Sequence, residues 1–433
     1  MPGIKIPLGP QHPALKEPEM FTFELDGEKI IGAEVRMGYA HRGIEKGFED
    51  RTFIQGIYLA ERICGICSTS HTTPFVLNAE EMLKLEVPKR AQYIRALVGE
   101  LERVHSHLLW LGVAGHEVGF DSLFMYTWRD REVVQDMLEL ISGNRVHYGI
   151  NTIGGVRRDI DAGQIAKLKD MNAAVRQRTD YYIKMCTAEP TFIARIKGVG
   201  MLPTKDALEL CAVGPMARAS GVKRDVRKDD PYCCYDEMPF DVITADTCDV
   251  LGRAVVRAFE LLQCCRIIDF ILNNLPEGDV KIRAARRIPQ AEAVNRYEAP
   301  RGENIHYAKS NGTDKPERVK VRAPTYANIP ATLVTLRNSY IADIPIIVAA
   351  IDPCFCCADR MVRLIDQRKG RDDVWPWQRL QEYARDSLRR RASSADYADY
   401  ADERSAEGSV TNPPTRESAE SAKSAAKEAE GIR

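Results

Sequence analysis

Two cysteine stretches about 290 residues apart constrain this chain more than any other feature. The first holds the Cys-x-x-Cys pair Cys64 and Cys67, and the second holds the pair Cys354 and Cys357. Two such pairs can surround one metal position with four soft thiolates. Thiolates select zinc, copper(I), iron or nickel over magnesium and calcium. A fold that uses all four must bring the beginning and the end of a long chain together.

A structural zinc site is the common alternative for four cysteines. Structural zinc pairs usually lie within a few tens of residues of each other, in a region too small to fold without metal. Here the pairs are far apart in a chain that has ample material for a core. Charged residues also flank the thiols, namely Arg62, Asp352 and Arg360. Such charges suit a site where protons and anionic ligands are handled.

The other cysteines carry weaker signals. Cys356 lies inside the second stretch but breaks the x-x spacing, so we expect it to be a neighbour of the metal rather than a ligand. The remaining seven are most simply small buried hydrophobic residues; they are Cys186, Cys211, Cys233, Cys234, Cys248, Cys264 and Cys265.

Composition excludes several classes of protein. The 61 basic and 62 acidic residues give a net charge of -1, which does not favour nucleic acid or an anionic membrane surface as a partner. Twelve cysteines in 433 residues are too few for a disulfide scaffold, and the first residues do not resemble an export signal. The most apolar run, Ile344 to Ile351, is far shorter than the ~20 residues needed to span a bilayer.

Apolar residues at spacings of three and four predict four long helices. They are expected from Pro88 to about Leu111, around Val133 to Ile141 with Gly143 as the end, from Ala162 to Met185, and from Asp249 to Asn274. Long helices with little sheet between them favour a mainly α fold, a long-helix bundle with small α+β additions.

The remaining segments read as hairpin, loop and tail. Phe21 to Met37 predicts a β-hairpin with its turn at Asp26-Gly27, and the proline-rich segment before it predicts a loop that presents side chains to a site. Loops and short strands are expected over 276–328, followed by a helix over 330–340.

These expectations divide the chain into four parts. They are an N-terminal part with the first cysteine pair, 1–87, a helical core, 88–275, a returning part with the second pair, 276–366, and a disordered or processed tail, 367–433.

A series of motifs identifies a family resemblance. In chain order they are Gly9-Pro-Gln-His-Pro13, Arg42-Gly-Ile-Glu45, Glu61-Arg-Ile-Cys-Gly-Ile-Cys67 with His71, Gly99 to His107, Gly143-Asn-Arg145, Thr152 to Arg157, Ala299-Pro-Arg-Gly302 and Asp352-Pro-Cys-x-x-Cys357. Together they resemble the large, catalytic subunit of nickel-iron hydrogenases, in the membrane-associated, energy-converting branch. That branch is related to the quinone-site, 49 kDa subunit of respiratory complex I, which has a similar fold but lacks the four cysteines.

The resemblance implies a nickel-iron centre that carries carbon monoxide and cyanide, NiFe(CN)2(CO). By position, Cys64 and Cys354 are similar to the terminal nickel ligands, and Cys67 and Cys357 to the thiolates that bridge nickel and iron. The implied reaction is reversible hydrogen oxidation and proton reduction. Cys354 or Cys357 would accept the first proton.

Further site residues follow from the same resemblance. Glu17 matches a carboxylate thought to relay protons; otherwise it is a solvated loop residue. Arg301 matches the arginine held over the open metal position, and Asp352 would orient it through an ion pair. The alternative for Arg301 is a surface loop.

Weaker candidates complete the set. His12 and His71 are candidates to bond to cyanide, backbone or carboxylate, but a satisfied core histidine is at least as strongly expected for each. Glu45 matches a ligand of an additional magnesium or iron ion. In many hydrogenases a histidine stands where this chain has Arg360, and the chain is cut there. The arginine puts that additional metal in doubt.

Partners are also implied. No other cysteine group has iron-sulfur spacing, so electrons must leave through an iron-sulfur small subunit. Ferredoxin-like and antiporter-like, ion-translocating membrane subunits would follow, with this chain as a peripheral subunit on the cytoplasmic side. The competing interpretation is a complex-I-like electron-transfer subunit whose cysteines are empty or hold zinc.

Overall fold

The computed structural model describes residues 4–15, 17–359, 362–366, 371–375, 379–380 and 382–387. The chain divides into two units, Met1–Arg360 and Met361–Arg433. Both cysteine pairs belong to the first unit. Arg360 and most of the expected tail, 367–433, lie outside the described residues.

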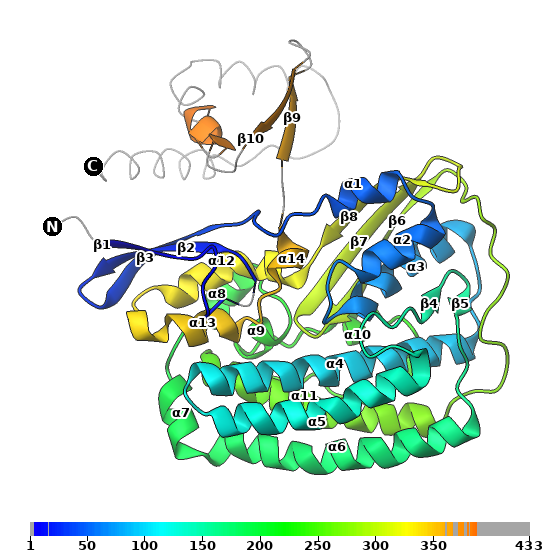
Figure 1. Ribbon diagram of the computed structural model, residues 1–433, viewed down its shortest axis with the longest axis horizontal. Helices are drawn as coiled ribbons and strands as arrows, with labels where there is room; N and C mark the ends of the chain where they lie inside the picture. The colour runs from blue at the N-terminus through cyan, green and yellow to red at the C-terminus, as the bar shows by residue number, and fades with distance from the viewer. Residues whose placement is uncertain are drawn as a thin grey trace, which may run out of the picture. The chain divides into compact units, whose positions relative to one another are not determined.

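Four long helices form the core of the first unit and run alongside one another (Figure 1). They are α4 (Lys89–Glu117), α5 (Asp121–Ser142), α6 (Ala162–Ala188) and α11 (Val250–Asn273). The expected bundle is thereby confirmed. Gly143 ends α5 in the left-handed conformation, at φ 85°, and Asp249 caps the first turn of α11 through the backbone N–H of Gly252.

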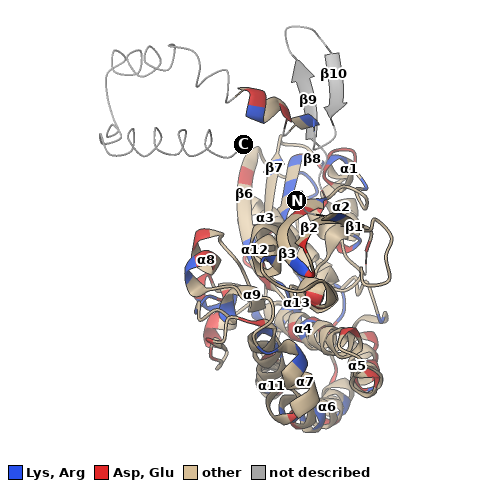
Figure 2. Ribbon diagram, turned by 90° about the vertical axis from the view of Figure 1, so that its left-hand side faces the viewer, with Lys and Arg blue, Asp and Glu red and all other residues tan. Residues whose placement is uncertain are grey.

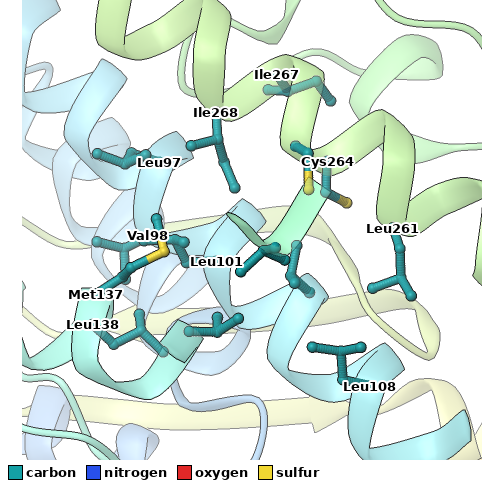
Figure 3. Close-up of a cluster of buried hydrophobic side chains, with 14 of the residues drawn as sticks. Leu97, Val98, Leu101, Leu108, Met137, Leu138, Leu261, Cys264, Ile267 and Ile268 are labelled. Carbon is teal, nitrogen blue, oxygen red and sulfur yellow. The ribbon is translucent and has the colours of Figure 1, made fainter. Parts of the chain in front are cut away.

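The bundle is held together by a large apolar cluster (Figure 3). Leu97, Leu101 and Leu108 of α4 pack with Met137 of α5 and Ile268 of α11, and all five are at most 1% exposed. Because α4 also contacts α3 and α13, it is buried on nearly every side, charged residues included. Its polar side chains therefore face other protein groups instead of water.

The segment before the bundle is richer in structure than the expected hairpin and loops. Strands β1 (Ile4–Leu8), β2 (Met20–Asp26) and β3 (Lys29–Arg36) form an antiparallel sheet in the order β1-β2-β3. The hairpin is confirmed, although its two-residue turn is Gly27-Glu28, since Asp26 pairs with Lys29. Three helices follow; they are α1 (Ile44–Glu49), α2 (Phe53–Glu61) and α3 (Ser68–Leu83).

The returning part differs from expectation in two respects. The loops and strands expected over 276–328 are present, but the strands are longer than expected and form a three-stranded antiparallel sheet made of β6 (Ala291–Ala299), β7 (Gly302–Ser310) and β8 (Pro316–Arg322). The buried face of this sheet includes polar residues, which hid the alternation of apolar and polar positions. The following helix, α12, spans Pro324–Leu336 instead of the expected 330–340. It begins earlier because Pro324 occupies the first turn, where a proline is well tolerated.

The remaining elements are short. In the first unit they are β4 (Asn151–Thr152), β5 (Gly155–Val156), α7 (Pro190–Ile196), α8 (Thr204–Glu209), α9 (Pro215–Arg218), α10 (Val226–Asp229), η1 (Tyr235–Glu237), η2 (Ile341–Asp343), α13 (Ile344–Ala350) and α14 (Phe355–Ala358). In the second unit, β9 (Val362–Asp366) pairs antiparallel with β10 (Arg371–Trp375).

The distribution of charge and hydropathy agrees with the composition. Acidic and basic residues are interspersed over the elements (Figure 2), in keeping with the net charge of -1. Within the described part of the chain, the structure contains no helix that combines the length and apolar character needed to cross a bilayer.

Candidate metal centre

The two cysteine pairs meet in one buried cluster. Cys64 and Cys67 lie between α2 and α3, and Cys354 and Cys357 lie at the short helix α14. Their four Sγ atoms are all within 4.8 Å of one another, and the residues are 2% to 4% exposed. Cys354 Sγ is central: it lies 2.7 Å from Cys357 Sγ and 3.4 Å from Cys64 Sγ. Four buried sulfur donors in this arrangement fit a soft transition-metal ion.

The loops that carry these thiols are fixed by backbone hydrogen bonds. Cys64 Sγ accepts bonds from the backbone N–H groups of Ile66 and Cys67, each at 3.3 Å. The backbone N–H of Cys354 donates to Thr325 Oγ1 at 3.0 Å. Donors aimed at sulfur favour the thiolate, the form in which cysteine binds metal.

Arg42 joins the two cysteine loops. Its Nη1 donates to the carbonyl oxygen of Arg62 at 2.8 Å, and its Nη2 donates to the carbonyl oxygen of Ile63 at 2.7 Å. The same Nη2 donates to the carbonyl oxygen of Cys356 at 3.2 Å. One planar guanidinium therefore holds the residues before Cys64 and before Cys357 at a fixed separation. The sequence motif contained Arg42, but nothing in it indicated this role.

Glu102 of α4 caps the helix that follows the first pair. Its carboxylate accepts hydrogen bonds from the backbone N–H groups of Thr69 at 2.6 Å and Ser70 at 2.9 Å, and from Ser70 Oγ at 2.6 Å. These donors belong to the first turn of α3, which has no side-chain cap of its own from Cys67. Burial raises the pKa of Glu102 to about 8, although the three hydrogen bonds oppose this shift. The sequence did not predict this residue as part of the site.

Arg301 and Asp352 form the expected ion pair beside the thiols. Arg301 Nη2 donates to Asp352 Oδ1 at 2.8 Å, and Arg301 Nε donates to the Asp352 carbonyl oxygen at 2.7 Å. Both residues are buried, and Arg301 Nη1 has no hydrogen-bond partner among the described residues. Burial alone would lower the pKa of Arg301, but Asp352 and the nearby cysteines raise it well above its usual value. The guanidinium therefore stays charged.

A small apolar cavity of about 50 Å³ adjoins this ion pair. Its walls include Leu15, Val113 and Val348, together with Arg301 and Asp352. The cavity thus brings apolar surface and the charged pair to the same place.

Glu17 reaches the cluster from the loop before β2. Its Oε2 accepts a hydrogen bond from the backbone N–H of Cys356 at 2.8 Å. A carboxylate oxygen of Glu17 also lies within 4.8 Å of the Sγ atoms of Cys354 and Cys356. The predicted relay carboxylate is therefore beside the thiols, and Cys356, expected as a neighbour, lies beside both.

Three candidate residues have other partners. His12 is exposed, and its Nδ1 accepts a bond from the backbone N–H of Ala14. His71 is buried, with its Nδ1 3.1 Å from Nε2 of His306. Glu45 accepts from the backbone N–H of Val321 and pairs with Lys320 Nζ at 3.1 Å. In the described part of the chain, neither group of metal-capable donors contains any of the three.

Two family models match the chain. Residues 117–288 and 281–360 match the model described as respiratory-chain NADH dehydrogenase, 49 kDa subunit. Residues 42–112, which include the first cysteine pair, match the model described as nickel-dependent hydrogenase.

Individual proteins are similar over most of their length. The chain is 41% identical over 382 residues to the membrane-bound hydrogenase subunit alpha of Pyrococcus furiosus, covering 84% of this chain and 90% of that one. It is 41% identical over 364 residues to the carbon monoxide-induced hydrogenase of Rhodospirillum rubrum, covering 83% of this chain and all of that one. A chain of the archaeal membrane-bound sulfane sulfur reductase has a similar structure, with a TM-score of 0.79, 31% identity, and coverage of 83% and 99%.

Proposed function

This chain belongs to the family that unites nickel-dependent hydrogenase large subunits with the 49 kDa subunit of respiratory NADH dehydrogenase, and we propose that it is the catalytic subunit of a membrane-associated nickel-iron hydrogenase. The single observation that carries the proposal is the meeting of four buried thiols from opposite ends of the chain. Related hydrogenases from Pyrococcus furiosus and Rhodospirillum rubrum support it.

Cys64, Cys67, Cys354 and Cys357 would hold the metal centre, which we propose to be NiFe(CN)2(CO). When bound, such a centre supplies the redox and Lewis-acid chemistry for reversible cleavage of hydrogen. The protein positions and buries it: Arg42 and Glu102 fix the two loops, and the low exposure of the thiols excludes bulk water.

Proton transfer would use the chain's own groups. Cys354 Sγ accepts a proton during hydrogen cleavage and passes it to the carboxylate of Glu17, which lies within 4.8 Å. Glu17 is half-buried, so it can exchange that proton outward. The hydrogen bond from the Cys356 N–H keeps the carboxylate turned toward the thiols.

Arg301 would act by electrostatics. Its Nη1 has no partner among the described residues, so it can stabilise negative charge that develops in the site. Asp352 holds the guanidinium in place through two hydrogen bonds. The adjoining apolar cavity suits a small nonpolar gas such as hydrogen.

The relatives are subunits of multi-subunit membrane complexes, and this chain would work in a similar assembly. Within the described residues, every metal-capable donor group that contains cysteine lies at this one site. Electrons would therefore pass to an iron-sulfur small subunit and then to ferredoxin-like partners. Antiporter-like membrane subunits would couple this transfer to ion translocation, with the chain bound peripherally on the cytoplasmic face.

Substitution of one cysteine from each pair tests the proposal. We expect Cys67→Ser and Cys357→Ser each to abolish assembly of the nickel-iron centre and hydrogen evolution, because a hydroxyl is a poor ligand for a soft metal. Cys211→Ser, at an exposed thiol outside the cluster, serves as the matched control and should leave both unchanged. Full hydrogen evolution by either cluster variant would contradict the proposal.

A complex-I-like subunit is the second candidate, favoured by the 49 kDa family match over residues 117–360. It predicts purified protein without nickel and with no hydrogen evolution in wild type. The retention of all four thiols in one cluster argues for the hydrogenase instead.

A further inference from the structure

Cys356 gives the site a fifth thiol that the four-cysteine centre does not use. Its Sγ lies 3.4 Å from Cys354 Sγ. Together with a carboxylate oxygen of Glu17, these two sulfur atoms form a second group of metal-capable donors, all within 4.8 Å of one another. Cys354 belongs to both groups, so they share one ligand.

The second group is more open to solvent than the first. Cys356 and Glu17 are half-buried, whereas the four cysteines of the main cluster are 2% to 4% exposed. The backbone of Cys356 is also fixed on both sides. Its N–H donates to Glu17 Oε2 at 2.8 Å, and its carbonyl oxygen accepts from Arg42 Nη2 at 3.2 Å. The three donors are therefore held together before any ion arrives.

We propose that Glu17, Cys354 and Cys356 form a loading site that binds divalent nickel before the ion reaches the four-cysteine centre. This inference rests on the proposed function, since it assumes that nickel is the resident metal. It assigns a role to Cys356 and a second role to Glu17.

The donor types suit a stepwise loss of water. A nickel ion from solution carries water ligands, and a carboxylate oxygen exchanges readily with water at such an ion. Two thiolates then supply soft donors, and the thiols release their protons as they bind. The ion keeps its bond to Cys354 while its bonds to Glu17 and Cys356 break, and Cys356 takes up a proton as it leaves. Bonds to Cys64, Cys67 and Cys357 form as these thiols release their protons. No electron is transferred, and nickel remains divalent.

Charge also favours this route. Arg42 and Arg301 both contact the cysteine loops, so a bare cation that approached without anionic ligands would meet two guanidinium groups. The carboxylate of Glu17 offsets that repulsion at the more exposed side of the cluster.

The first test measures loading kinetics. Full-length protein produced in nickel-depleted cells is mixed with nickel chloride, and nickel-thiolate absorbance and bound nickel are followed over time. We expect Cys356→Ser to acquire nickel about tenfold more slowly than wild type while reaching the same final content. Cys211→Ser, the exposed control, should load at the wild-type rate.

A Cys356→Ser variant that loads as fast as wild type would overturn the inference. A final nickel content as low as that of Cys354→Ser would also overturn it, because Cys356 would then be a permanent ligand.

The second test traps the ion at the loading site. In Cys64→Ser the four-cysteine centre is broken but the loading group is intact, so we expect about one nickel per chain with an altered absorbance spectrum. Adding Cys356→Ser to that variant should remove this nickel. Nickel that is absent from Cys64→Ser, or that persists in the double variant, refutes the loading site.

The same pair of variants separates the two proposals. If wild type and Cys64→Ser bind the same amount of nickel with the same absorbance spectrum, the four-cysteine centre does not hold nickel, and the proposed function fails. The loading site is still tested in that case, because its test compares the nickel content of Cys64→Ser only with that of the double variant.

Discussion

Glu17 and Glu19 lie two residues apart in one loop, yet their surroundings differ. Glu17 is half-buried and bonds to the Cys356 backbone. Glu19 is fully buried beside Asp359, whose carboxylate accepts bonds from the backbone N–H groups of Gly38 and Ala40. Burial, and then the neighbouring Asp359 and Glu17 carboxylates, raise the pKa of Glu19 to about 10. Glu19 is therefore a neutral acid at physiological pH.

This difference predicts a pH dependence of stability. The folded protein keeps the Glu19 proton up to about pH 10, whereas the unfolded chain loses it near the ordinary pKa of 4.5. Between these values folding takes up a proton, so the free energy of unfolding falls as pH rises, by at most about 1.4 kcal/mol per pH unit. Glu19→Gln should flatten this dependence between about pH 5 and pH 8 and stabilise the protein at neutral pH. Denaturant unfolding of wild type and Glu19→Gln across this pH range measures the free energy of unfolding of each protein. Parallel pH profiles for the two proteins would contradict the raised pKa of Glu19.

For Glu17 the prediction concerns proton transfer. Glu17→Gln removes the carboxylate but keeps the size of the side chain, so hydrogen–deuterium exchange activity should fall at least about 100-fold while the final nickel content is retained. Glu28→Gln, at an exposed turn residue of the same N-terminal sheet, is the control and should exchange at the wild-type rate. Unchanged exchange in Glu17→Gln would remove this residue from the proton path.

Helix α3 depends on a residue of α4. Glu102 accepts three hydrogen bonds from Thr69 and Ser70, in the turn that begins directly after Cys67. Removing the carboxylate leaves buried backbone donors without a partner.

We expect Glu102→Ala to lower the free energy of unfolding by about 2–4 kcal/mol and to weaken metal retention at the first cysteine pair. Glu209→Ala, at an exposed position of α8, should change stability by less than about 0.5 kcal/mol. Denaturant unfolding and nickel content after dialysis against a chelator measure the two effects. A Glu102→Ala protein as stable as the Glu209→Ala control would contradict the capping role.

The same helix shows what sequence patterns could and could not predict. The periodicity of Leu97, Leu101 and Leu108 predicted α4 and its packing face. It did not predict that Glu102 and Arg103 are also fully buried, because a single stripe assumes one solvent-exposed face. Their partners lie on α3 and β6, far away in sequence. Pairings of this kind depend on tertiary packing.

Across the whole molecule, the two ends of the first unit converge on the metal site. The four cysteines, Arg301, Asp352 and Glu17 were predicted from motifs, and the structure brings all of them to one place. The sheet of β6 to β8 was missed because polar residues such as Asn304 and His306 occupy its buried face. The bridging role of Arg42 could not be predicted either, since it uses three backbone carbonyl groups that have no signature in sequence.

Metal analysis and infrared spectroscopy on the full-length chain, purified in its native complex, test whether the buried thiols hold a nickel-iron centre. We predict nickel and iron in equal amounts at the four-cysteine site, after subtraction of iron-sulfur iron, together with carbonyl and cyanide stretching bands. Zinc at the cluster, or nickel-free protein without those bands, would contradict it.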